Sequence, residues 1–320
     1  MALKSTKLVG DIGGTNARFA LVDEHHNPCH AQVYRADQYA SLHDAINHYL
    51  QNLDAEPPTA AAIAVATRVL GDKIEFTNNE RWSFSTTDLA AQMGVPDLCV
   101  VNDFTALALA VPHLSAAQLE QVGQGKPKLN EPMGVIGPGT GCGVSGLIPV
   151  STDQWRALNS EGGHCSASVS SEREMVVFSM FAARFGHVSF ERFLSGPGLV
   201  NIVTALREID GVAAKETQPE TVTREGLSGA DPQCTEALEI FCALLGSYAG
   251  DLSLMLGASG GVFVGGGIVP RLGDFFAQSQ FRTRFENKGR VTDELVGVPT
   301  YVIKDPYPGL RGAARLLVHA

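Results

Sequence analysis

The stretch KLVGDIGGTNARFALVD, residues 7–23, decides the fold, because it predicts a strand, a glycine turn and a second strand. Residues 8–9 lead into the turn, and residues 17–22 lead out of it with an alternating apolar pattern. In the turn, the adjacent Gly13 and Gly14 permit a positive φ and remove the Cβ atoms that would hold a ligand away. Such a turn can direct several N–H groups at one anion, and the Thr15 hydroxyl adds a donor.

Asp11 adds an acidic group at the start of this turn. A carboxylate repels a phosphate, so its place beside an anion-binding turn indicates a divalent cation between the two. We therefore interpret the hairpin as the holder of the phosphate end of a magnesium nucleotide. A tight hairpin in which Asp11 acts as a cap explains the glycine pair equally well. Two better-known glycine motifs are excluded, because a P-loop needs a lysine and a helix, and the dinucleotide fingerprint needs a helix and another glycine spacing.

Length and composition limit the class of protein. At 320 residues, the chain exceeds one ordinary core and suggests two domains. The net charge of −10 disfavours nucleic acid and anionic membranes as partners.

The six cysteines include no CxxC or CxC pair, which argues against a zinc ribbon or a redox motif. The first residues lack the apolar core of a signal peptide, so we expect a cytoplasmic protein with reduced cysteines. Residues 252–270 are uncharged and nearly long enough to cross a bilayer, but their six glycines favour a helix end, a turn and a buried strand.

Hydrophobic periodicity predicts alternating strands and helices after the first hairpin. We expect strands in residues 29–39, 60–66 and 97–101, and helices in residues 41–53, 86–93 and 104–111. Residues 67–79 resemble a turn and an edge strand. Asn102 and Asp103 lie between a buried strand and a helix, which is the arrangement of a site at the carboxyl edge of an α/β sheet.

The strand–glycine turn–strand pattern returns after residues 112–132, a polar segment that we expect to cross to a second domain. Residues 133–136 lead into a turn at 137–143, and residues 144–150 lead out of it. A second echo lies at residues 261–270, which predict a strand, a turn and a helix that starts at Pro270. We expect long helices at 172–185 and 234–256 and an amphipathic one at 309–319. Two α/β halves would then face one cleft, with each hairpin holding a nucleotide from its own side.

Six motifs stand in one order along the chain: residues 11–18 (DIGGTNAR), 102–106 (NDFTA), 137–143 (GPGTGCG), 161–164 (EGGH), 195–199 (SGPGL) and 265–270 (GGGIVP). This set resembles the bacterial glucokinases of the hexokinase–actin ATPase superfamily, over essentially the whole chain. The resemblance implies an α/β protein with the two-domain actin-like ATPase (ribonuclease H-like) fold and an active site in the interdomain cleft. The small α/β domain would comprise residues 1–112 and 304–320, and the large α/β domain residues 113–303.

The resemblance implies ATP-dependent phosphorylation of glucose to glucose 6-phosphate, the first step of glycolysis, with ATP and Mg²⁺ as cofactors. It makes Asp103 the general base that accepts the hydroxyl proton. It assigns the sugar contacts to Asn102, Asp103, Glu161, His164 and Glu191. From the residues alone, other roles fit as well: a helix cap for Asp103, an ordinary polar residue for His164, and a surface ion pair with Arg192 for Glu191.

The resemblance also implies three groups of nucleotide-binding residues, and for each of them plain turns are the alternative. The first group faces the β- and γ-phosphates, with Asp11 toward Mg²⁺ directly or through water: Gly10, Asp11, Ile12, Gly13, Gly14 and Thr15. The second group would form the opposing phosphate clamp: Gly139, Thr140 and Gly141. The third would lie near adenosine: Gly265, Gly266 and Gly267.

The sequence departs from the family pattern at three places. Related sugar kinases and repressors carry a zinc-binding cysteine cluster after a comparable histidine, but here Cys165 alone follows His164, and we expect no zinc. Cys142 stands in the second glycine turn, where glucokinases tend to have leucine. Residues 166–170 replace a more acidic and apolar stretch, which bears on the strictness of sugar selection.

Two other functions are compatible with the sequence. One is a kinase for another hexose, such as mannose, fructose or glucosamine, because the sequence does not show where each hydroxyl lies. The other is a sugar-sensing regulator without activity; such relatives carry a helix-turn-helix ahead of the core, whereas the first core strand here begins by about Lys7. We expect glucose and ATP as ligands, no nucleic acid or membrane as partner, and, from the family resemblance, a homodimer.

Overall fold

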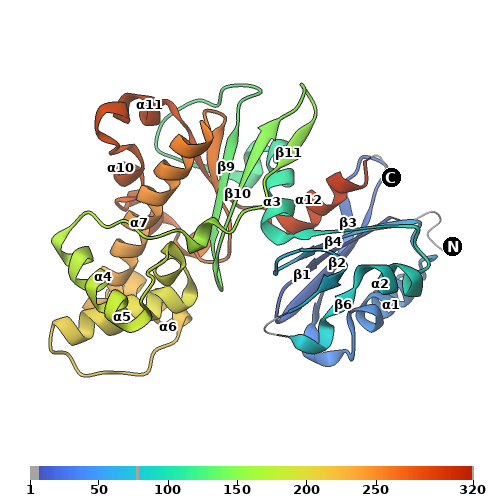
Figure 1. The fold of residues 1–320 in the computed structure, drawn as a ribbon, viewed down its shortest axis with the longest axis horizontal. Helices are drawn as coiled ribbons and strands as arrows, with labels where there is room; N and C mark the ends of the chain where they lie inside the picture. Colours follow the sequence, from blue (N-terminus) through green and yellow to red (C-terminus); the bar gives the residue numbers. More distant parts are fainter. Residues whose placement is uncertain (1–6, 77–78, 319–320) are drawn as a thin grey trace. The chain divides into compact units, whose positions relative to one another are not determined.

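The computed structural model describes residues 7–76 and 79–318. The chain forms two compact units: unit 1 contains residues 1–114 and 305–320, and unit 2 contains residues 115–304. Each unit is built on its own β-sheet with helices packed against it (Figure 1). Residues 77–78 of the expected edge strand and residue 319 of the expected last helix lie outside the described residues.

Unit 1 contains a five-stranded sheet in the order β3-β2-β1-β4-β7. Its first hairpin, β1 (Lys7–Ile12) and β2 (Asn16–Val22), is antiparallel, which confirms the prediction from the opening stretch. β3 (Pro28–Arg35) pairs antiparallel with β2, whereas β4 (Ala60–Val65) runs parallel to both β1 and β7 (Asp97–Asn102). Because β1, β4 and β7 are parallel, their carboxyl ends meet at one edge of the sheet.

Both faces of this sheet are covered by helices. Successive side chains of a strand point to opposite faces, so Ile63 of β4 packs with α1 (Leu42–Asn52) and α2 (Thr86–Met93), and its neighbour Ala62 packs with α12 (Pro308–Leu316). α12 also packs on α3 (Asp103–Ala110), so closely that a Cβ at Gly312 would overlap the carbonyl oxygen of Ala106. The end of the chain thus returns to cover the first sheet.

Local capping explains where the first two helices begin. The Ser41 hydroxyl accepts a hydrogen bond from Asp44 N at the start of α1, and the Ser85 hydroxyl accepts one from Asp88 N at the start of α2. α2 ends at Gly94, which has a left-handed φ of 67°. The helices expected at residues 41–53 and 86–93 are confirmed.

Unit 2 contains a six-stranded sheet in the order β11-β10-β9-β12-β13-β8. Its antiparallel hairpin, β9 (Met133–Pro138) and β10 (Cys142–Pro149), confirms the return of the opening pattern, with a turn of only three residues. β12 (Gly261–Val264) runs parallel to β9 and β13 (Thr300–Ile303), and β11 (Trp155–Ala157) pairs with β10. β8 (Leu119–Val122) forms an edge strand against β13, so the segment expected only as a polar crossing also contributes to the sheet.

The helices of unit 2 are α4 (Glu172–Phe185), α5 (Gly196–Ile209), α6 (Pro219–Ser228), α7 (Pro232–Leu256), α8 (Val269–Leu272), α9 (Asp274–Gln278), α10 (Phe281–Glu286) and α11 (Thr292–Gly297). Among the described residues, α7 is the one helix long and apolar enough to cross a membrane, but 78% of its most apolar window is buried by the other elements. α7 ends at Leu256 and β12 begins at Gly261, so residues 252–270 form the expected helix end, turn and strand.

Short elements complete the two units. They are β5 (Lys73–Ile74), β6 (Phe84–Ser85), and the 3₁₀ helices η1 (Ala36–Gln38), η2 (Glu80–Trp82), η3 (Val111–His113), η4 (Ala116–Gln118), η5 (Gly162–His164), η6 (Phe190–Arg192) and η7 (Gly289–Val291). η5 and η6 carry predicted sugar-contact residues.

Candidate active site

Asp11 lies near the carboxyl end of β1, where the hairpin register places Arg18 opposite it. The Arg18 Nη1 donates to Asp11 Oδ2 at 3.1 Å. On its other side, the carboxylate lies against the first turn of α12, since an ideal Cβ at Gly309 would be 3.0 Å from Asp11 Cγ. Burial raises the pKa of Asp11, and the charge and hydrogen bond of Arg18 oppose this rise.

Asn102, the last residue of β7, caps α3. Its Oδ1 accepts hydrogen bonds from Phe104 N at 2.9 Å and Thr105 N at 3.4 Å, while its Nδ2 donates to Thr67 O at 3.3 Å. A helix cap was the alternative interpretation for Asp103, but the structure gives that role to Asn102. Asp103 is instead the first residue of the helix.

Asp103 is a half-buried carboxyl in the first turn of α3. Its Oδ1 accepts a hydrogen bond from Phe104 N at 2.9 Å. Burial, followed by the negative charge of Asp11, raises the pKa of Asp103 to about 7, and the hydrogen bonds that it accepts only partly offset this. A carboxyl whose pKa lies near neutral pH is suited to accept a proton as a general base.

The first glycine turn does not use left-handed backbone. Neither Gly13 nor Gly14 has a positive φ, so the expectation based on conformational freedom was wrong for this pair. The turn is closed instead by a bond from Gly13 N to Asn16 O at 2.9 Å. An ideal Cβ would lie 3.4 Å from Asn16 O at Gly13 and 3.5 Å from its nearest neighbours at Gly10, which are ordinary contacts. At Gly10 and Gly13, neither a left-handed backbone nor close packing of the protein requires glycine.

The second glycine turn, residues 139–141, connects β9 to β10 in unit 2. Gly139 N donates to Gly141 O at 2.7 Å, and Gly139 O accepts from Gly196 N at the start of α5 at 2.8 Å. Nothing lies within 4 Å of an ideal Cβ at Gly139. The packing of the protein therefore does not require glycine there, which is the pattern expected of a position kept bare for a ligand.

The turn that follows β12 lies beside the carboxyl end of β9. Gly265 N donates to Ile136 O at 2.8 Å. Gly266 has a φ of 79°, and a Cβ there would overlap Pro138 O. Gly266 is therefore required by the fold itself, whereas the space around an ideal Cβ at Gly267 is open.

The EGGH motif packs on the first residue of β10. A Cβ at Gly163 would overlap Cys142 O, and the Tyr248 hydroxyl donates a hydrogen bond to Gly162 O. At the ends of the motif, His164 Nε2 lies 4.0 Å from Glu161 Oε2, and the two side chains are 62% and 45% exposed. The two glycines thus anchor the motif, and the two polar side chains remain at the surface.

Glu191, in η6, reaches back to the second glycine turn. Its Oε2 accepts a hydrogen bond from Cys142 N at 2.9 Å. Among the described residues, Glu191 forms no ion pair with Arg192, the alternative interpretation; the Arg192 guanidinium instead lies over the Phe185 ring, 4.2 Å from its centroid. No local sequence pattern indicates this link, because its partners are 49 positions apart along the chain.

A short antiparallel pairing holds the EGGH motif beside η6. Ala167 N donates to Val188 O at 2.9 Å, and Phe190 N donates to Cys165 O at 3.0 Å. This pairing involves the segment that departs from the family pattern, and it connects the stretch that carries Glu161 to the stretch that carries Glu191. Unit 2 therefore brings four of the six sequence motifs together around the β9–β10 hairpin.

Two residues that were not assigned from the sequence lie against the Asp11 carboxylate in unit 1. Arg18 pairs with Asp11, and Gly309 allows α12 to approach the same carboxylate. Arg18 could have been found from the sequence, because an antiparallel hairpin with residues 12 and 17 opposite each other also pairs residues 11 and 18. Gly309 belongs to the other end of the chain and carries no comparable signal.

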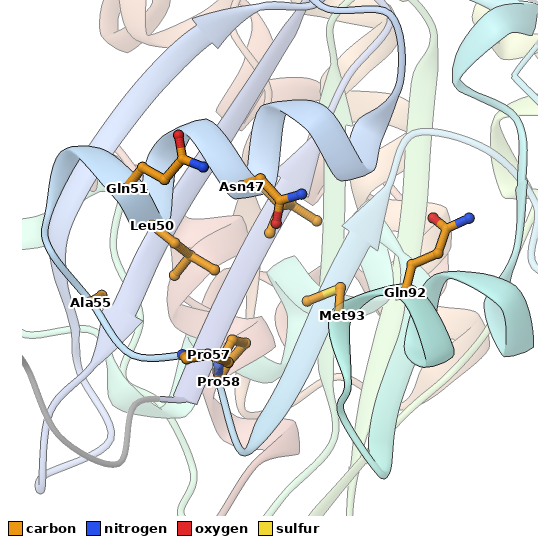
Figure 2. A pocket seen from close by; sticks show the side chains of 9 residues that line it. Asn47, Leu50, Gln51, Ala55, Pro57, Pro58, Gln92 and Met93 are labelled. Atoms are coloured by element: carbon orange, nitrogen blue, oxygen red, sulfur yellow. The ribbon is translucent and has the colours of Figure 1, made fainter.

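A hollow of about 260 Å³ in unit 1 lies apart from these residues (Figure 2). α1, α2 and the segment before β4 line it, including Leu50, Pro58 and Met93. Because this segment precedes β4, the hollow lies toward the amino end of that strand, opposite the edge that carries Asp103.

The described residues also contain one group with metal-ligand spacing: Glu225, Asp231 and Cys234. Asp231 is already engaged, because its Oδ1 accepts from Cys234 N at the start of α7 and its Oδ2 accepts from Arg207 Nη2 at 2.6 Å. Burial raises the pKa of the Cys234 thiol to about 11, which disfavours the thiolate that binds metals. This group carries no metal assignment.

Comparison with known proteins agrees with this architecture. The crystal structure of a glucokinase from an Antarctic psychrotroph superposes with a TM-score of 0.87 and 33% identity, covering 99% of this chain and 100% of the other. A ROK family glucokinase from Streptomyces griseus, solved in complex with glucose and AMPPNP, shares the fold at a TM-score of 0.64 and 19% identity, covering 98% and 99% of the two chains. The fold and the site therefore define an α/β protein of the sugar-kinase class.

Sequence comparison identifies the family within this class. The family model described as Glucokinase matches residues 8–320. A curated glucokinase from Chromobacterium violaceum is 49% identical over 308 residues, which cover 96% of this chain and 88% of that protein. The chain belongs to the glucokinase family.

Proposed function

We propose that the chain catalyses the ATP-dependent phosphorylation of glucose to glucose 6-phosphate, with Asp103 as the general base. The observation that carries this assignment is the division of roles at the end of β7, where Asn102 caps α3 and leaves Asp103 in the first helical turn at the carboxyl edge of the sheet. Relatives named glucokinase at nearly full coverage support the reaction, and the ROK family glucokinase solved with glucose and AMPPNP supports ATP as the phosphoryl donor.

Asp103 accepts the proton of the sugar hydroxyl as that oxygen bonds to the terminal phosphorus of ATP, the bond from that phosphorus to the bridging oxygen breaks, and ADP leaves. Phosphoryl transfer of this kind depends mainly on positioning and on neutralising charge. In this proposal, the sugar is oriented by Asn102, Glu161, His164 and Glu191. Gly139 and Gly13 present bare backbone to the phosphates. In this proposal, the site residues of unit 1 and those of unit 2 act on the same two substrates. We therefore propose that the units are the two domains of an actin-like ATPase, with substrates bound between them.

The residues of unit 1 suit a magnesium ion. Asp11 and Asp103 are two carboxyls close enough for the charge of one to raise the pKa of the other, and a divalent cation relieves such repulsion. Asp11 would hold Mg²⁺, which supplies charge neutralisation to the triphosphate when bound. The carboxylate is already oriented by Arg18 at 3.1 Å.

A hexose panel with ATP tests the reaction and the choice of sugar. We expect Mg²⁺-dependent ADP formation with glucose and much slower turnover with mannose, fructose or glucosamine, measured in a coupled assay with Mg²⁺ withheld as the control. Faster turnover with one of the other hexoses would reassign the substrate, and no turnover with any of them would reject the kinase.

The Asp103→Ala variant tests the assigned base. We expect turnover to fall by about 10²–10⁴, while glucose binding measured by calorimetry is largely retained. Turnover near that of the parent would remove Asp103 from the catalytic role.

A further inference from the structure

We propose that Glu191 is a positioning residue that couples sugar binding to the second glycine turn and thereby raises nucleotide affinity when sugar is bound. This inference rests on the proposed function, in which one end of the Glu191 carboxylate faces the sugar and residues 139–141 face the phosphates. The structure supplies the connection between the two, the hydrogen bond of 2.9 Å from Cys142 N to Glu191 Oε2.

The glycine at position 141 is explained by this contact. An ideal Cβ at Gly141 would lie 2.5 Å from Glu191 Oε2, so any larger residue would displace the carboxylate from the turn. Gly139 differs, because nothing lies within 4 Å of its ideal Cβ. The two glycines of one turn thus have different purposes: Gly139 leaves room for a ligand, and Gly141 leaves room for Glu191.

The segment that carries Glu191 holds both ends of the turn. At one end, Gly139 O accepts a hydrogen bond from Gly196 N at 2.8 Å, and at the other end Cys142 N donates to Glu191. Ser195 stiffens the connection between these two anchors, because its hydroxyl donates to Glu191 O at 2.8 Å and accepts from Gly198 N at 3.0 Å. A movement of η6 is therefore transmitted to the turn at two points.

The carboxylate can serve the sugar and the turn together. A carboxylate has two oxygens with about four acceptor sites, so Oε2 can keep the Cys142 N–H while the other oxygen accepts from a sugar hydroxyl. A bound sugar then restricts the rotation of the Glu191 side chain and, with it, the backbone of the turn. A nucleotide that binds to an already ordered turn loses less conformational entropy, and by linkage the nucleotide raises sugar affinity by the same factor.

Calorimetric titration of AMPPNP–Mg²⁺, with and without saturating glucose, measures this coupling. For the parent protein we expect glucose to lower the Kd of the nucleotide by about fivefold or more. In Glu191→Gln, the ratio of the nucleotide Kd without glucose to that with glucose should fall to about one. An amide has a single acceptor oxygen, which cannot accept from both Cys142 N and the sugar hydroxyl. In Gly141→Ala the factor should also fall to about one, since the new methyl group displaces Glu191 from the turn while leaving its carboxylate available to the sugar.

His164→Ala is the matched control, because His164 is a proposed sugar contact on the other motif. We expect this variant to weaken glucose binding but to keep the parent coupling factor at saturating glucose. Retention of the parent factor in both Glu191→Gln and Gly141→Ala would overturn the inference, as would a factor of one in a parent protein that phosphorylates glucose. A parent protein that binds glucose and nucleotide but transfers no phosphate would instead refute the proposed function and leave the coupling measurable.

Discussion

Replacing Asp103 with asparagine should abolish the base and, at the same time, stabilise unit 1. The pKa of Asp103 is raised from 3.8 to about 7, mainly by burial and next by the charge of Asp11. Because the folded state holds the proton more tightly than the unfolded state, stability falls as the pH rises from about 4 to about 7, and it stays at this lower level above pH 7. Asparagine keeps the size of the side chain and its acceptor for Phe104 N but carries no charge, so the variant escapes this loss.

The size of the effect follows from the same pKa. The difference between the usual pKa of 3.8 and the raised pKa of about 7 at Asp103 corresponds to about 4 kcal/mol of folding stability if the full shift counts, because each pKa unit is worth about 1.36 kcal/mol. Water reaches the half-buried carboxyl and screens it, so we expect a gain of about 1–2 kcal/mol at pH 8. At pH 5 the gain should be smaller by about 1 kcal/mol, since most of the folded protein is then protonated at Asp103.

Urea denaturation without Mg²⁺ or nucleotide measures this gain. The chain has two tryptophans, Trp82 buried in unit 1 and Trp155 in β11 of unit 2, so a Trp155→Phe background makes fluorescence report on unit 1 alone. Both Asp103→Asn and its parent would carry that substitution. A variant that is less stable than its parent at pH 8, or a difference that does not change between pH 5 and pH 8, would refute the reasoning.

Asp72→Asn is the control with the opposite sign. Asp72 is an exposed carboxyl in the same unit, and hydrogen bonds from the hydroxyls of Ser85, Thr86 and Thr87 lower its pKa. Its ionised form therefore stabilises the folded state above pH 4, and that contribution is lost as the pH falls. We expect Asp72→Asn to lose stability at pH 8 and to approach its parent at acid pH.

Three other perturbations separate ligand binding, proton transfer and packing. Gly139→Ala should leave the thermal midpoint within about 2 °C of the parent, because nothing lies within 4 Å of its ideal Cβ. The same variant should weaken AMPPNP binding by about tenfold or more. Gly163→Ala should instead lower the thermal midpoint, because its Cβ would overlap Cys142 O. The pH profile of kcat/KM for glucose should fall about tenfold per unit below pH 7 as Asp103 gains its proton, and a flat profile between pH 5 and pH 8 would contradict that assignment. Arg284→Met leaves the buried Glu174 without the ion-pair partner that lies 2.7 Å away, which should cost about 3–5 kcal/mol in urea denaturation, and a loss below about 1 kcal/mol would contradict it.

Local sequence was enough to predict the five strands of the unit 1 sheet and the helices α1 to α4, α7 and α12, but it did not predict α5, α6, β11 or β13. The alternation around Phe19 and the apolar run ending at Val65 define strands, and serines such as Ser41 define helix starts, because each of these signals depends on neighbours within a few residues. The order of the six glycine and acid motifs was likewise sufficient to indicate the glucokinase family. β8 was missed because its short run, LEQV, lies in a polar segment and gains its strand pairing from β13, far along the chain.

The purpose of individual residues within the motifs was decided only by tertiary packing. Packing determines that Asn102, and not Asp103, caps α3, that burial near Asp11 raises the pKa of Asp103, and that Glu191 binds the backbone of the second turn. It also separates glycines that the sequence presents as equivalent, since Gly139 has open space and Gly163 has none. The physical reason is that chain-local patterns report secondary structure, whereas pKa values, hydrogen-bond partners and free volume depend on atoms brought together from distant positions of the chain.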